Sequence, residues 1–162
     1  MNNRQAASGK FITAICLTVL LVACGGPGDQ ATVPEAQPAG ATHADIGKHT
    51  VHFSAQSTDQ LPPEIASAYN IVRSKNRAML NVSVIDNGSN KPVHAEVSVK
   101  TVNLTGQLKN VVMREVREQE AIYYIGETAV ANRETLNFDI SITPEGETDA
   151  ASVRFQRQFY TD

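Results

Sequence analysis

Tryptophan is absent from the 162 residues, cysteine occurs only twice, and 14 basic side chains face 17 acidic ones. The formal net charge is therefore −3. Binding to nucleic-acid phosphates usually needs a strong positive field, so we expect no nucleic-acid partner. The lack of tryptophan and of a cysteine pair in the folded region excludes an antibody-type domain. Hydrophobic residues still make up 41% of the chain, with ten further glycines, which is ordinary for a globular protein.

Long apolar runs are also missing. The longest extends from Phe11 to Val22, after a start that carries Arg4 and Lys10 and no acidic residue. As a helix, this run would rise only about 18 Å, which is too short to span a bilayer. A cationic start, a short apolar run and small residues at its end are typical of a secretory signal peptide.

The apolar run ends in Leu21-Val22-Ala23-Cys24-Gly25, which resembles the lipobox of bacterial lipoproteins. The resemblance implies that Cys24 becomes the first mature residue, with a diacylglycerol on its thiol and an acyl chain on its amino group. Two or three acyl chains hold a protein in a bilayer far more durably than one. Gly25 stands where inner-membrane lipoproteins carry aspartate, which favours outer-membrane sorting. The alternative is an ordinary signal peptide with a cysteine near its cleavage site.

Three segments follow from this interpretation. Residues 1–23 are the expected signal peptide, and residues 24–47 are the expected lipidated cysteine and disordered linker. The linker contains several prolines and glycines, no aromatic residue and no apolar period, so it cannot bury enough surface to offset its ordering entropy. Residues 48–162 are the expected folded domain. That domain contains no cysteine, which excludes a disulfide or a thiol nucleophile there.

Apolar and polar residues alternate through the expected domain with a period of two. The alternating segments are 51–55, 80–84, 93–99, 108–117, 121–130, 136–142 and 153–159. About seven such segments, separated by turn residues, predict an antiparallel sandwich of immunoglobulin-like or fibronectin-like architecture. Val111 and Val112 disturb the alternation, which we interpret as a bulge within one strand.

Residues 61–70 break the alternation. Prolines at the start and an asparagine at the end predict one short helix between strands, packed through Ile65, Ala68 and Tyr69. The alternative interpretation is a lid over a site.

Three stretches resemble an uncharacterised family of exported Gram-negative proteins, domain of unknown function 4426. They are residues 69–78, residues 114–125 and residues 136–144. The likeness covers essentially Lys48 to Asp162. It implies a compact exported β domain, and it brings no activity, cofactor or catalytic residue.

Catalytic and metal-binding patterns are weak in this sequence. The candidates for paired carboxylates are Glu115, Glu118, Glu120 and Glu127. Charges on the outer faces of strands are the simpler explanation for them. His49 and His52 are three residues apart, which places them on opposite faces of a strand. A metal site would need convergence of side chains from separate segments, such as His94, Met79 or Met113. We therefore assign no catalytic residue, metal ligand or cofactor.

Arg73, Lys75 and Arg77 place three cations within five residues of an otherwise acidic domain. One interpretation is a solvated loop whose cations offset nearby carboxylates. The other is a contact for an anionic envelope partner, such as protein carboxylates, lipopolysaccharide phosphates or the peptidoglycan stem. Together with the lipobox, this pattern favours a lipid-anchored periplasmic binding or assembly module. A periplasmic metal-binding protein and an envelope hydrolase are the alternatives.

Overall fold

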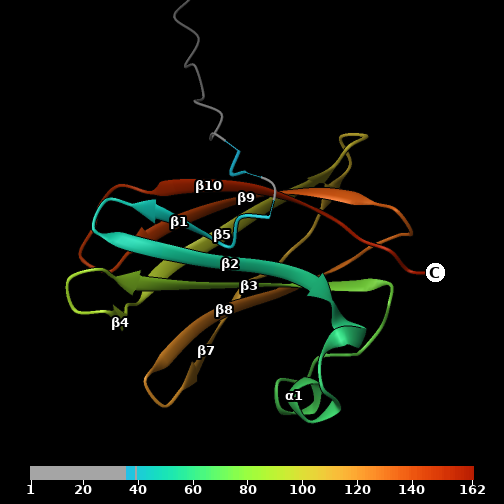
Figure 1. The fold of residues 1–162 in the computed structure, drawn as a ribbon, viewed down its shortest axis with the longest axis horizontal. Coiled ribbons are helices and arrows are strands. Elements are labelled where there is room, and N and C mark those ends of the chain that lie inside the picture. Colours follow the sequence, from blue (N-terminus) through green and yellow to red (C-terminus); the bar gives the residue numbers. More distant parts are fainter. Residues whose placement is uncertain (1–35, 39) are drawn as a thin grey trace, which may run out of the picture. The chain divides into compact units, whose positions relative to one another are not determined.

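The computed structural model describes residues 36–38 and 40–162 (Figure 1). The expected signal peptide, Cys24 and the first part of the expected linker lie outside these residues. Among the helices in the described residues, none is both long enough and apolar enough to cross a membrane.

Two antiparallel sheets form the domain (Figure 1). The first sheet has the order β1-β2-β3-β8-β7, with β4 paired to β3. Its strands are β1 (His43–Ile46), β2 (His49–Ser57), β3 (Arg77–Asp86), β4 (Lys91–Pro92), β7 (Arg114–Glu118) and β8 (Ala121–Ala129). The second sheet has the order β10-β9-β5-β6. Its strands are β5 (Ala95–Asn103), β6 (Leu108–Lys109), β9 (Thr135–Pro144) and β10 (Ala151–Gln158).

The strand order confirms the predicted fold class. Seven of the strands in the described residues have five or more residues: β2, β3, β5, β7, β8, β9 and β10. In the first sheet they follow β2-β3-β8-β7, and in the second β10-β9-β5. Numbered as strands A to G, these are the A-B-E-D and G-F-C sheets of an immunoglobulin-like sandwich.

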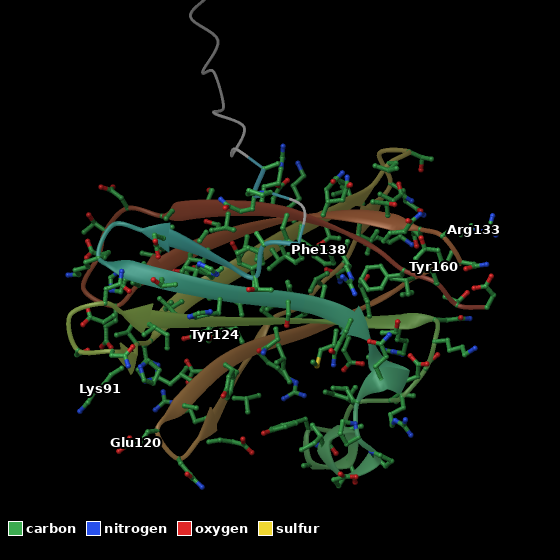
Figure 2. All side chains as sticks on the ribbon, in the orientation of Figure 1. Lys91, Glu120, Tyr124, Arg133, Phe138 and Tyr160 are labelled. Atoms are coloured by element: carbon green, nitrogen blue, oxygen red, sulfur yellow. The ribbon has the colours of Figure 1, made fainter. Side chains whose placement is uncertain are left out.

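The core lies between the two sheets, where the period-two pattern places its apolar residues. Leu80 in β3 is 2% exposed, and Phe138 in β9 is 1% exposed. Figure 2 shows Phe138 between the layers. The same cluster includes inward-facing side chains from neighbouring strands, among them Val51, Phe53, Val82, Val84, Leu136, Ile140, Ile142, Val153 and Phe155.

A helix is present where one was expected, but of the predicted packing stripe of Ile65, Ala68 and Tyr69, only Tyr69 packs against the apolar cluster beside the helix. A 3-10 turn, η1 (Thr58–Gln60), precedes α1 (Pro63–Ala68). Ala66, not Ile65 or Ala68, is the buried helical residue. It packs with neighbours on the outer face of the first sheet in a second apolar cluster: Leu61, Ile71 and Ile125. Six residues make fewer than two turns, so helical periodicity has little to act on.

The predicted bulge at Val111 and Val112 is also wrong. The segment 108–117 is not one strand, because β6 belongs to the second sheet and β7 to the first. The connection crosses from one sheet to the other, with Val111 buried and Val112 exposed. A disturbed alternation looks the same for a bulge and for a change of sheet, since both shift which residues face inward.

The folded part of the chain begins before Lys48, the boundary expected from composition. His43–Ile46 forms β1, which pairs with β2 from His49 to His52. Ala44 on this strand is buried in the core. Backbone pairing holds β1 in place, and composition does not record backbone hydrogen bonds.

Candidate functional site

An open groove runs between β2 and β10, which border the two sheets on the same side of the sandwich. β1 pairs with β2 only as far as His52, so the second half of β2 is not covered by this strand. Two adjoining cavities of about 470 and 390 Å³ lie here. They share the lining residues Gln56, Gln60, Gln156 and Arg157. We call the surface formed by residues 54–57, Gln60 and residues 155–160 the seam groove.

Three stacked aromatic rings lie beneath the seam groove. The centroids of Phe53 in β2 and Phe155 in β10 are 4.7 Å apart, and those of Phe155 and Phe138 are 4.9 Å apart. All three rings are buried. Offset or tilted aromatic stacks add about 0.5 to 1.5 kcal/mol beyond their buried area. The groove therefore rests on a closed, tightly packed floor.

The chain's own N-terminal segment crosses the upstream part of this seam. The Gln37 N–H donates a 2.8 Å hydrogen bond to the Arg154 carbonyl, and Ala36 forms a parallel bridge with Arg154. The Thr42 carbonyl accepts a 2.9 Å hydrogen bond from the Phe53 N–H. This segment thus contacts the border strand of each sheet before it continues into β1.

Arg157 is a cation at an inward-facing position. Val153 and Phe155, four and two residues earlier on the same face of β10, are buried, whereas Arg157 is exposed. It forms no ion pair with any residue that the structure describes. The sandwich is therefore open to solvent at Arg157, and its charge faces the seam groove.

The predicted cationic loop lies at the same end of the molecule as the seam groove. Arg73 Nη2 donates to the carbonyl of Asp59, next to Gln60, at 2.6 Å. Lys75 Nζ donates to a main-chain oxygen of Asp162, the last residue of the sequence, at 3.1 Å. Tyr160, close to Asp162 in sequence, lines the groove and lies near the C-terminal end in Figure 2. The partner of Arg73 is a neutral peptide carbonyl, which leaves the charge of Arg73 uncompensated.

Arg77 differs from the other two cations of the loop. Its Nε lies 3.5 Å from the carboxylate of Glu127 on β8, the strand beside β3. The loop itself is held by Thr58, which is fully buried. The Thr58 hydroxyl donates to the Val72 carbonyl at 2.8 Å and accepts from the Ser74 N–H at 2.9 Å. The structure thus places Arg73 and Lys75 against Asp59 and Asp162, which are close in sequence to groove residues, and Arg77 in an ion pair with Glu127.

A second polar cluster ties the two sheets together at another place. Tyr124 on β8 is buried, and its hydroxyl accepts a 2.7 Å hydrogen bond from the Ala95 N–H and donates to Glu115 Oε2 at 3.2 Å. His94 Nδ1 lies 3.1 Å from the same Glu115 oxygen, and Arg117 Nε donates to Oε1 at 2.5 Å. We call this the His94 cluster.

Electrostatics in the His94 cluster favour a structural role. Arg117 above all, helped by His94 and Tyr124, lowers the pKa of Glu115 despite its partial desolvation. Burial raises the pKa of the Tyr124 hydroxyl. The charges of the cluster are thus satisfied by one another, and the hydrogen bonds link β7 and β8 to the start of β5.

The side chains considered for metal binding and for paired carboxylates do not converge. Met79 packs in the apolar cluster under α1, whereas Met113 packs against the main core. Among the histidines and methionines considered for metal binding, only His94 lies within ion-pair distance of a carboxylate, that of Glu115. The part of the chain that the structure describes has no group of three or more His, Cys, Asp or Glu side chains able to hold a metal ion. His49 is buried and His52 exposed, which confirms their opposite faces.

Sequence reasoning missed the glutamines and Arg157 of the seam groove. The glutamines carry no pattern that distinguishes a groove from an ordinary polar strand face. Arg157 did carry a signal, because it occupies an inward position between Phe155 and Phe159 in the alternation of β10. A charge at such a position on a border strand marks an open edge.

Comparison with known proteins assigns the chain to a family. Residues 43–162 match the family model described as domain of unknown function (DUF4426), from the first residue of β1 onward. The chain belongs to the DUF4426 family. A crystal structure of a DUF4426 family protein from Pseudomonas aeruginosa PAO1 is 33% identical with a TM-score of 0.65, over 74% of this chain and 94% of that one.

Other comparisons add no activity to this DUF4426 domain. A family 123 glycoside hydrolase from Clostridium perfringens is 10% identical, over 67% of this chain and 27% of that one. Its TM-score of 0.35 is too low to support an argument. No curated protein matches the chain. Membership of the family supports a shared fold, and any function has to be argued from the residues themselves.

Proposed function

We propose that this DUF4426 domain is a lipid-anchored periplasmic binding module, held at the outer membrane through Cys24, with the seam groove as its binding surface. The lipobox-like sequence before Cys24 supports the anchor. The observation that carries the binding role is the seam groove itself, where an open border between two sheets coincides with Arg157, a cation that forms no ion pair among the described residues.

Charge distribution supports an anionic ligand. The chain has a formal net charge of −3, yet Arg157 lines the groove and Arg73 contacts Asp59, next to Gln60 of the groove, and neither forms an ion pair with a side-chain carboxylate among the described residues. Lys75 lies close by, at Asp162. Cations on a groove wall attract anions more strongly than the same cations scattered over a surface, because the low-dielectric walls focus the field. Arg157 therefore joins the predicted loop as a binding residue, and Arg77, paired with Glu127, leaves it.

In-cell photo-crosslinking tests this proposal. A photo-reactive residue in place of Tyr160, which is 58% exposed in the groove, is expected to capture a discrete envelope partner. The matched control replaces Ser98, an exposed residue on the outer face of β5. Arg73→Gln combined with Lys75→Gln and Arg157→Gln should abolish the Tyr160 adduct. Lys91→Gln combined with Lys100→Gln, which removes cations elsewhere, should leave it unchanged.

Two outcomes would refute the binding role. Equal adducts from the Tyr160 and Ser98 positions would show that capture is nonspecific. A triple variant that still forms the adduct, with unchanged thermal stability, would show that these cations do not bind the partner. Stability should change little in either set, since exposed charges contribute only about 0 to 1 kcal/mol each.

A further inference from the structure

Two strand edges are free in the seam groove. Neighbouring residues of a strand point their backbone N–H and C=O groups to alternate sides. Because the Arg154 carbonyl faces the seam, the backbone groups of Gln156 and Gln158 on β10 face it as well. Because the Phe53 N–H faces the seam, so do those of Ala55 and Ser57 on β2. On this seam-facing edge, no residue in the described part of the chain pairs with these four as a strand, although each pairs with β9 or β3 on its other edge.

The chain itself shows that β10 accepts an extended segment on this edge. Gln37 and Ala36 lie parallel to β10 and use the Arg154 carbonyl, the position immediately before the free stretch. An added strand would continue this pairing at Gln156 and Gln158. The adjoining 390 Å³ cavity, lined by Gln158, Tyr160 and other residues of the groove, provides the space for its side chains.

Charge selects the kind of strand that fits. Arg157 lines the groove from the same strand, and Arg73 and Lys75 contact Asp59 and Asp162, which are close in sequence to groove residues. These cations disfavour a basic segment and favour one with aspartate or glutamate. Nucleic acid or lipid phosphates would also meet the charge requirement, but they cannot use the row of backbone donors and acceptors that a strand would pair with.

We infer that the partner of the seam groove is a polypeptide segment, extended and acidic, that adds to the free edge of β10 beyond Arg154. This inference rests on the proposed function, because it names the partner of the same groove. Backbone hydrogen bonds to Gln156 and Gln158 supply the pairing, and carboxylates of the segment contact Arg157 and the cationic loop.

A proline substitution on the edge separates backbone pairing from side-chain contact. Gln158→Pro removes the N–H that faces the groove and keeps the bonds from β10 to β9, since proline is tolerated on a strand edge whose N–H points outward. Gln158→Ala removes the side chain and keeps the N–H. With the photo-reactive residue at position 160, Gln158→Pro is expected to lower the adduct yield at least about fivefold, the effect of one lost hydrogen bond. Gln158→Ala should stay close to the unsubstituted chain.

Mass spectrometry of the adduct identifies the attached segment, which should come from a protein and contain Asp or Glu. Equal yields from Gln158→Pro and the unsubstituted chain, at unchanged thermal stability, would overturn strand addition while leaving the binding role intact. A lipid or glycan in the adduct would also overturn it. If no variant gives an adduct, the proposed function fails as well. A further outcome would overturn the contact between Arg157 and the segment. If Arg157→Gln makes the purified chain dimerise and the adduct still forms, then the charge of Arg157 prevents edge-to-edge pairing and does not bind the segment.

Discussion

The rings of Phe53 and Phe155 stack with their centroids 4.7 Å apart, although one belongs to the first sheet and the other to the second. Each ring lies where the N-terminal segment makes its last backbone contact with that strand, at Phe53 on β2 and at Arg154, next to Phe155, on β10. The stack therefore closes the core at the point where the seam groove begins, and Phe138 extends it into the interior.

This stack should be a major source of stability. Phe155→Ala removes both ring contacts and leaves a cavity, so we expect the free energy of unfolding to fall by about 3 to 5 kcal/mol. Urea unfolding followed by circular dichroism measures the change. Tyr160→Ala is the control, because the Tyr160 ring is exposed and lies two residues past the end of β10. It should change stability by no more than about 0.5 kcal/mol. Similar losses for both variants would contradict the assignment of Phe155 to the core.

Gly126 on β8 is expected to tolerate no side chain. A Cβ there would lie 2.6 Å from both Met113 Sδ and Val111 Cγ1, in the segment that crosses between the sheets. Gly126→Ala should cost about 1 to 3 kcal/mol through overpacking. Adding Met113→Ala should recover part of that loss, because it removes one of the two clashing atoms. A double variant with strictly additive losses would show that the crossing segment does not press on β8.

Glu134 anchors the β5–β6 hairpin to the turn before β9. Its carboxylate accepts hydrogen bonds from Asn103 Nδ2 at 2.9 Å and the Ala131 N–H at 2.8 Å, and it pairs with Lys109 at 2.9 Å. Burial is the largest single influence and raises the pKa of Glu134, but the hydrogen bonds and the lysine together outweigh it. The net result is a pKa below the ordinary value.

A lowered pKa in the folded state has a definite sign. The Glu134 carboxylate stabilises the fold at pH values above its unfolded pKa of about 4.3, and this contribution is lost as the pH falls through the lower folded-state pKa. Glu134→Gln should cost about 1 to 3 kcal/mol at neutral pH. It should also make the fall in stability with acidification shallower, as measured by thermal unfolding from neutral to strongly acidic pH. An equally steep fall in the variant would assign the acid sensitivity to other carboxylates.

Cys24 is the residue through which we expect the chain to be lipidated and attached to the membrane. Cys24→Ser should abolish incorporation of labelled palmitate and release the chain from the membrane fraction or leave it uncleaved. Cys16→Ser, in the expected signal segment, is the matched control and should label normally. Palmitate incorporation into the Cys24→Ser variant would refute the lipobox interpretation.

Period two alone was enough to predict a sandwich. The apolar faces of β3 and β9 were readable, because a two-residue repeat leaves Leu80, Val82, Phe138 and Ile140 on one side of each strand whatever the neighbours are. The end of α1 was readable for a similarly local reason, since Asn70 adopts a positive φ of 54° that asparagine tolerates. Arg73, Lys75 and Arg77 could be singled out by charge, but not divided into groove cations and an internal ion pair.

That division was decided by the tertiary structure. Glu127 is far from Arg77 in sequence and meets it because β3 pairs with β8. Likewise, β2 and β10 come from opposite ends of the domain, and their free edges form one groove only after both sheets are stacked. Local alternation specifies which face of a strand is buried. It contains no information about which strands become neighbours or which edges stay open, because these depend on contacts between residues distant in the chain.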